Sequence, residues 1–115
     1  MKKTDTQMKK IYRSKVPFRI SLGGGGTDMP DYCKHQTGAV INTTIRLFTH
    51  TSLQLRDDTK VTFKWINKDE FEEHEFSDNL DCSYGLKLFK ATHNHICKRF
   101  KVEPIGYDII TYQDV

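Results

Sequence analysis

Four consecutive glycines, Gly23 to Gly26, stand directly before Thr27 and Asp28. Such a run allows positive φ angles repeatedly and removes every Cβ from a stretch of backbone. A ligand can then approach the main-chain N–H groups closely. The carboxylate of Asp28 can accept hydrogen bonds from sugar hydroxyls. A neutral polyol suits this carboxylate better than a phosphate does. The common phosphate-loop motif also does not fit, because no lysine follows the loop.

A structural interpretation of the same stretch stays open. The glycines can form a tight turn, and Asp28 can be the N-cap of a short helical turn over residues 29–34. Arg19 lies on the segment that leads into the loop. Its guanidinium can pair with Asp28 or point at a phosphate, and the spacing does not separate these roles.

The segment THNHIC is the other group of residues with possible chemistry. His93 and Cys97 stand four positions apart, so a helix places them on one face. Two ligands make a weak metal site, and a partly buried helix face is favoured, so no metal is expected. His74 lies among acidic residues and is expected to be solvated.

The first half of the chain predicts strands around the glycine loop. Residues 11–22 favour a strand that contains Pro17, and Pro30 with Asp31 indicates a short helical turn. Residues 39–58 are rich in β-branched and apolar side chains. They are too long for one strand and predict two, with a bend near Arg46.

The second half predicts a hairpin, a helix and a last strand. Asp57 and Asp58 predict a turn, and residues 60–67 alternate, with Val61, Phe63 and Trp65 on one face. With the β segments before the turn they predict an antiparallel meander or hairpin. A short strand over residues 71–76 or a loop follows. A helix is expected from about Asp81 with Asp78 or Asp81 as its N-cap, and residues 107–115 predict a strand. The predicted apolar stripe of the helix comprises Leu86, Phe89, Ile96 and Phe100. The fold class is therefore α+β, or mixed α/β.

Length and composition bound the class of protein. The 115 residues suit one domain. Three cysteines at irregular spacing give no disulfide framework, and no apolar run approaches the roughly 20 residues of a membrane span. A cytoplasmic protein is the expectation.

Residues 1–10 are expected to form a basic, flexible leader. The net charge of +3 depends on residues 1–15, so the folded body lacks the basic excess of a nucleic-acid binder.

The stretch KVPFRISLGGGGTDMPDY resembles the first motif of the GHMP small-molecule kinases. Its form is closest to the D-glycero-D-manno-heptose 7-phosphate kinase branch, which GAVINTTIRLFTHTSLQL also resembles. The resemblance covers Arg13 to Val115 and implies a fold like domain 2 of ribosomal protein S5. It also implies phosphoryl transfer from MgATP to the anomeric hydroxyl of a heptose 7-phosphate, in the synthesis of nucleotide-activated heptose for surface polysaccharide.

The resemblance also implies roles for individual residues. Asp28 would hold sugar hydroxyls. Arg19 would be the catalytic residue, either near the transferred phosphoryl group or organising the site. Galactokinases carry bulky acid and imidazole groups at the positions of Gly25 and Gly26, and this departure argues against galactose. The implied substrate-binding residues are Gly24, Gly25, Gly26, Thr27, Asp28 and Tyr32.

For the nucleotide, Trp65 and Tyr84 are candidates to stack the adenine, although core packing of Trp65 is favoured. The second glycine-rich motif of these kinases, which wraps the ATP phosphates at a helix N-terminus, would begin where the sequence stops at Val115. The catalytic acid is also absent. The 115 residues are therefore expected to be the truncated N-terminal part of a kinase, inactive alone, that does not bind ATP or Mg²⁺ tightly. The alternative is a non-catalytic module that binds a sugar phosphate or associates with itself.

Overall fold

The computed structural model describes residues 10–115 and divides into two compact units. Of the described residues, unit 1 comprises residues 10–14 and His50–Tyr112, and unit 2 comprises Lys15–Thr49 and Gln113–Val115. Except for Lys10, the predicted leader over residues 1–10 lies outside the described residues. Within the described part, no helix is long and apolar enough to cross a membrane.

Five strands form one mixed sheet in the order β1-β2-β5-β3-β4. Strand β4 pairs antiparallel to β3, whereas β5 pairs parallel to it with Val61 opposite Tyr107. This arrangement confirms the predicted mixed α/β class. The strands are β1 (Ile11–Gly23), β2 (Ile41–Leu55), β3 (Lys60–Trp65), β4 (Glu70–Glu75) and β5 (Tyr107–Gln113).

Two expectations about the strands are wrong. β2 is one strand of 15 residues rather than two, because neither glycine nor proline interrupts its β-branched run. β2 and β3 also do not form a hairpin, because β5 inserts between them. The Arg56 N–H donates to the carbonyl of Gly106 at 2.9 Å, and the hydroxyls of Thr51 and Thr111 meet at 3.0 Å. The hairpin of this region is β3–β4 instead.

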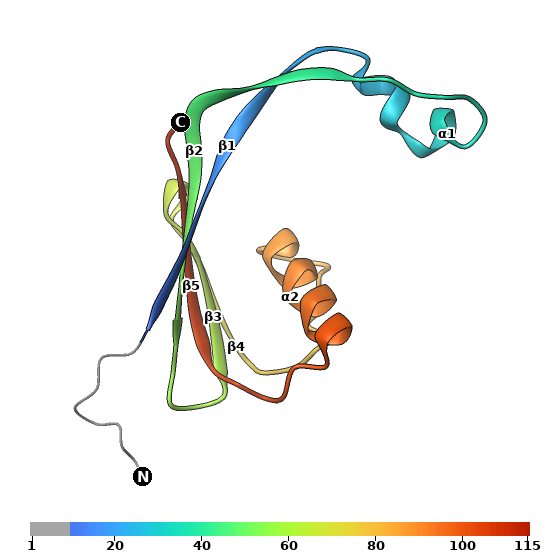
Figure 1. Cartoon of the computed structure of the whole chain (residues 1–115). Coiled ribbons are helices and arrows are strands. Elements are labelled where there is room, and N and C mark those ends of the chain that lie inside the picture. Colours follow the sequence, from blue (N-terminus) through green and yellow to red (C-terminus); the bar gives the residue numbers. More distant parts are fainter. Residues whose placement is uncertain (1–9) are drawn as a thin grey trace. The chain divides into compact units, whose positions relative to one another are not determined.

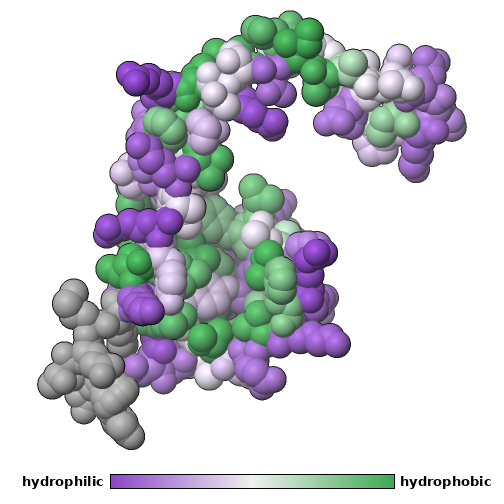
Figure 2. All heavy atoms as spheres, viewed as in Figure 1, coloured by the Kyte–Doolittle hydropathy of each residue, from purple (hydrophilic) through white to green (hydrophobic). Residues whose placement is uncertain are grey.

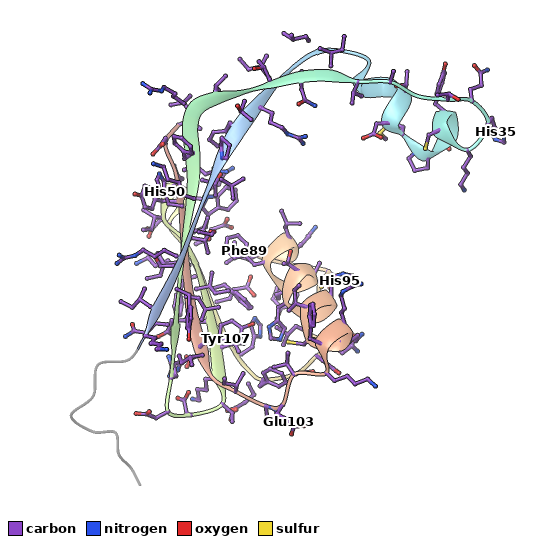
Figure 3. The ribbon with its side chains drawn as sticks, in the orientation of Figure 1. His35, His50, Phe89, His95, Glu103 and Tyr107 are labelled. Atoms are coloured by element: carbon purple, nitrogen blue, oxygen red, sulfur yellow. The ribbon has the colours of Figure 1, made fainter. Side chains whose placement is uncertain are left out.

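The core of unit 1 lies between the sheet and helix α2 (Lys87–Phe100), which covers one sheet face (Figure 1). Val61 and Phe63 are fully buried there, with Leu80 and Leu86 beside them. Phe89 of α2 and Tyr107 of β5 point into the space between helix and sheet, whereas His95 faces away (Figure 3). Burying one such aromatic or aliphatic side chain stabilises the fold by about 1.5–3 kcal/mol.

Helix α2 begins later than the sequence predicts. Asp81 accepts hydrogen bonds from the backbone and hydroxyl of Ser83 in a local turn, and Gly85 has a φ of 65°, so the helix starts only at Lys87. Neither Asp78 nor Asp81 is its N-cap, which is Leu86. Of the predicted stripe, Ile96 and Phe100 are exposed. Lys90, His93 and Cys97 are buried instead.

Glu72 of β4 joins the edge of the sheet to the start of α2. One carboxylate oxygen, Oε2, accepts the Leu86 N–H at 2.6 Å. The other, Oε1, lies 2.8 Å from His74 Nε2 and 3.0 Å from Nζ of Lys90, which is fully buried. Although burial of the carboxyl opposes ionisation, these three partners lower the pKa of Glu72 below its usual value. His74 is therefore partnered rather than solvated, contrary to the prediction.

His93 is buried in a second polar cluster between α2 and β5. Its Nε2 donates to the carbonyl of Ser77 at 2.7 Å, which leaves Nδ1 to accept from the Tyr107 hydroxyl. Cys97 Sγ lies 3.7 Å from the ring nitrogens. Burial lowers the pKa of His93, because the charged imidazolium is poorly solvated there. Both ring nitrogens are occupied, so this cluster is built to hold a neutral histidine.

We expect unit 1 to lose stability on acidification because of His93. At pH values above the ordinary histidine pKa of about 6.5, both folded and unfolded states are neutral and the full stabilisation is present. As the pH falls below that value the unfolded chain takes up the proton first, so the free energy of unfolding decreases. The urea midpoint between pH 7.5 and 5 should fall less in His93→Gln than in the wild type. His95→Gln, an exposed control, should keep the wild-type dependence; equal slopes in all three proteins would contradict the account.

Unit 2 differs from unit 1 in that none of its residues is buried. It contains the later part of β1, the earlier part of β2 and the loop between them. Asp114 accepts the Phe48 N–H at 2.9 Å, and Lys15 lies 4.3 Å from the centre of the Phe48 ring. Apolar side chains, including Leu22 and Ile41, lie at its surface (Figure 2). Unit 2 therefore presents apolar surface, as binding regions do.

Candidate functional site: the glycine loop

The glycine loop is closed by Thr27. Gly24 has a φ of 83°, and a 3₁₀ turn, η1 (Gly25–Asp28), follows it. The Thr27 hydroxyl lies 2.7 Å from the carbonyl of Gly24 and 3.0 Å from that of Ala39, and it accepts the Ala39 N–H at 3.0 Å. The Thr27 hydroxyl thus links the backbone of Gly24, at the start of the turn, to the backbone of Ala39.

The four glycines do not share one role. At Gly24 a Cβ would stand 2.0 Å from the carbonyl oxygen of Ala39, so close backbone packing and the positive φ both require glycine. At Gly23 and Gly26 an added Cβ would meet nothing within 4 Å. The fold therefore explains Gly24 by itself. It gives no steric reason for Gly23 and Gly26, whose open surfaces are available to a ligand.

Asp28 is not the N-cap of a helix, which is the structural role that the sequence left open for it. The short helix α1 (Pro30–Cys33) has Met29 at its N-cap and no side-chain capping bond. Asp28 is exposed. Among the described residues, no hydrogen bond or ion pair of its carboxylate is found, including one to Arg19. The Asp28 carboxylate at the end of the glycine turn is therefore an exposed hydrogen-bond acceptor.

Arg19 and Tyr32 lie on either side of the loop in sequence. Arg19 is exposed on β1, so its guanidinium is also free to meet an anion. Tyr32 lies in α1, and its hydroxyl is 3.3 Å from the amide oxygen of Gln36 one turn later. Both residues thus belong to the same unit as Asp28, with Tyr32 held locally.

Substitution at Gly24 and Gly26 should separate the two kinds of glycine. In Gly24→Ala the left-handed φ alone costs about 1–2 kcal/mol, and the contact with Ala39 adds to it, so amide exchange in the loop should accelerate. Gly26→Ala should leave exchange unchanged and weaken sugar-phosphate binding about tenfold, because the methyl group occupies the approach to the backbone. Loss of folding in Gly26→Ala, or unchanged sugar binding, would contradict this assignment.

The predicted nucleotide residues lie in unit 1. Trp65 is half-buried and packs on the core with its ring tilted against Phe89 at 6.2 Å, so the favoured packing role is confirmed. Its Nε1 is buried without a hydrogen-bond partner. The ring of Tyr84 is half exposed, and Lys90 Nζ lies 3.6 Å from its centre. The described residues show no ring contact between Trp65 and Tyr84.

The residues around α2 do not fit the phosphates of ATP. A helix N-terminus attracts anions through its free N–H groups, but the carboxylate of Glu72 already accepts from Leu86 there. A triphosphate would meet that negative charge. Nor do residues 10–115 bring together three side chains of the types that hold a metal ion.

Several structurally important residues were missed by the sequence analysis. Lys90, which is fully buried, pairs with the partly buried Glu72, and a Cβ at Gly85 would meet Glu72 Oε2. At Gly38 it would stand 2.4 Å from the carbonyl oxygen of Thr27. The position of Lys90 between Leu86 and His93 on one helix face was the available signal for the buried lysine.

Known proteins with similar sequence or fold are sugar kinases. The chain is 38% identical over 106 residues to the D-glycero-alpha-D-manno-heptose 7-phosphate kinase of Campylobacter jejuni. The match takes in 92% of this chain and 31% of the relative, so the chain spans about a third of that protein's length. The chain matches the N-terminal part of GHMP-type sugar kinases. No family model matches it.

Solved structures of sugar kinases also superpose on this chain. A crystal structure of a sugar kinase from Campylobacter jejuni superposes with a TM-score of 0.75 at 36% identity, over 96% of this chain and 35% of that one. A D-glycero-D-manno-heptose 1-phosphate kinase from Bacteroides thetaiotaomicron gives 0.80 at 25% identity, over 92% and 34%. A Lactococcus lactis galactokinase complexed with galactose gives 0.68 at 22% identity, over 92% and 27%, which shows the shared fold. The expected S5-like kinase fold is confirmed.

Proposed function

We propose that this chain forms the sugar-binding side of an ATP-dependent kinase that phosphorylates the anomeric hydroxyl of D-glycero-D-manno-heptose 7-phosphate. The observation that carries the proposal is the free carboxylate of Asp28, presented by a loop that Thr27 closes. Asp28 is no helix cap and the surfaces of Gly23 and Gly26 are open. A sugar can therefore bring its hydroxyls against the backbone and the carboxylate together.

In this mechanism the residues of unit 2 bind and orient the sugar. Asp28 accepts hydrogen bonds from sugar hydroxyls, and the backbone of Gly24 to Thr27 lies against the ring. Arg19 provides positive charge for the phosphoryl group that is transferred. Because phosphoryl transfer depends on positioning and charge stabilisation, a fixed sugar hydroxyl is the contribution expected from this part of a kinase.

ATP and Mg²⁺ are the proposed partners of the complete kinase. The base would lie at Trp65 and Tyr84, of which the Tyr84 ring is half exposed, whereas the triphosphate and metal would be held by other residues of the complete kinase. MgATP provides the phosphoryl group. The 115 residues alone are accordingly proposed to be inactive. The proposed setting is the cytoplasm, in a route to nucleotide-activated heptose for surface polysaccharide.

Calorimetric titration with the two substrates tests this function. We expect the chain to bind D-glycero-D-manno-heptose 7-phosphate and to bind MgATP at least about 100-fold more weakly, because its phosphate contacts are missing. Tight binding of MgATP would contradict the assignment of the triphosphate to other residues. Binding of neither ligand would contradict the proposed half-site and favour the alternative, a non-catalytic self-associating module.

A further inference from the structure

Lys90 of α2 is a lysine that the fold of unit 1 buries completely. Lysine is almost never buried in this way unless its charge is paired. Its Nζ lies 3.0 Å from Glu72 Oε1. This contact is an ion pair without the geometry of a hydrogen bond, and no other hydrogen-bond acceptor among the described residues reaches Nζ. Glu72 therefore accounts for the charge of Lys90 but not for every side of its ammonium.

The ring of Tyr84 is the second contact of this ammonium. Lys90 Nζ lies 3.6 Å from the centre of the ring, well within the roughly 6 Å over which a cation is attracted to an aromatic face. This attraction is stronger when the cation has been removed from water, and the side chain of Lys90 has no exposed surface. One face of the Tyr84 ring is therefore held on a buried charge.

The other face of the Tyr84 ring is turned outward. Tyr84 is 50% exposed although one face of its ring lies on Nζ, so the exposed half of the side chain comes from the opposite face and the ring edge. Tyr84 belongs to the segment between β4 and α2, outside any helix or strand. A ring in such a segment normally loses side-chain freedom when a planar ligand stacks on it, and this loss weakens binding.

The ammonium that restrains the ring is itself fixed by regular structure. The Lys90 N–H donates to the carbonyl of Leu86 at 3.1 Å, within α2 and its N-cap. Glu72 comes from β4, and its Oε2 accepts the Leu86 N–H. The strand, the helix and the segment between them thus meet at one charge. The orientation of the Tyr84 ring is set by the folded body of unit 1 before any ligand arrives.

We propose that Lys90 is a positioning residue for the nucleotide base, because it holds the Tyr84 ring ready for stacking. The inference rests on the proposed function, in which the adenine of ATP lies against Tyr84. Lys90 does not touch the base, since the ring lies between them. The cation also draws electron density toward its own side of the ring, which reduces the repulsion between the outer face and the electron-rich face of a purine.

Nuclear magnetic resonance titration of the 115-residue chain with adenosine tests the inference, because this nucleoside carries the base without the phosphates. The tyrosine rings are labelled with ¹³C, and the Tyr84 signal is assigned by its loss in Tyr84→Ala. Lys90→Met fills the buried volume without the charge. It should bind adenosine about fivefold more weakly than the wild type, because the ligand must then order the ring itself.

Two comparisons separate positioning of the ring from stability of the fold. In the Tyr84→Ala background, Lys90→Met should cause no further loss of adenosine affinity, because no ring is left to hold. Without ligand, Lys90→Met should also move the Tyr84 ring signals toward those of an unstructured tyrosine. His93→Gln alters the same buried helix face, but the ring contacts of His93 lie between helix and sheet. It should change neither the Tyr84 signals nor the adenosine affinity.

The possible failures are distinguishable. Equal adenosine affinity of the wild type and Lys90→Met, or an equal loss in the Tyr84→Ala background, would overturn the role of Lys90. A similar loss in His93→Gln would overturn it too, because stability alone would then explain the effect. No adenosine binding by the folded wild type, or binding that leaves the Tyr84 signals unchanged, would contradict the base site of the proposed function and this inference with it.

Discussion

We expect Asp28→Asn to bind D-glycero-D-manno-heptose 7-phosphate about 100-fold more weakly than the wild-type chain. Asparagine keeps the size of the side chain but removes the charge and one of its two acceptor oxygens. A hydrogen bond to a charged group contributes about 1.5–3 kcal/mol, and two sugar hydroxyls on one carboxylate account for the expected factor. The measurement is isothermal calorimetry at constant pH and salt.

Asp31→Asn is the matched control for this experiment. Asp31 is an exposed aspartate in the first turn of α1, three residues after Asp28. Its replacement changes the net charge by the same amount, so it should leave sugar-phosphate affinity within about twofold. If both variants lose affinity equally, the effect belongs to the general charge of the loop. If neither loses affinity, Asp28 does not hold the sugar.

The second large effect is expected at the buried ion pair of unit 1. Glu72→Ala should destabilise the fold by about 3–5 kcal/mol, because it leaves the fully buried ammonium of Lys90 without its carboxylate. The same change removes the acceptor of the Leu86 N–H at the start of α2. Urea unfolding followed by circular dichroism measures the loss.

Lys90→Met should be much less harmful, at about 1 kcal/mol. Methionine fills the buried volume, while the carboxylate of Glu72 keeps His74 and the Leu86 N–H as partners. The expected asymmetry is the test of the account, because an ordinary surface ion pair contributes at most about 1 kcal/mol. Equal and small effects of both substitutions would show that the pair is solvated and that α2 is held by its apolar contacts alone.

The parts of the fold that local pattern determines could be predicted from the sequence. Alternation placed Val61 and Phe63 on one face of a strand, and Pro30 with Asp31 marked a helical turn. The insertion of β5 between β2 and β3 could not be predicted in this way, because strand order depends on contacts far apart in the sequence. The start of α2 was missed because Asp81 turns back on Ser83 and Gly85 is left-handed, and Glu72 of a distant strand binds the N–H of the N-cap residue Leu86.

The candidate site, like the fold, could be predicted from the sequence only in part. The unusual glycine run marked the loop, and the type of residue at Asp28 indicated its chemistry. Only the structure separates Gly24, which the backbone of Ala39 requires, from Gly26, which nothing in the fold requires. The role of Thr27 also needed the structure, since its partner Ala39 lies twelve residues away.

The central claim is that the sugar binds at the glycine loop. Its most direct test is amide chemical-shift mapping on the ¹⁵N-labelled chain during titration with D-glycero-D-manno-heptose 7-phosphate. The account predicts that saturable shift changes concentrate at Gly23 to Asp28 and the adjoining residues of unit 2, and that Asp28→Asn removes them. Shift changes confined to unit 1, or no saturable change with the folded chain, would contradict it.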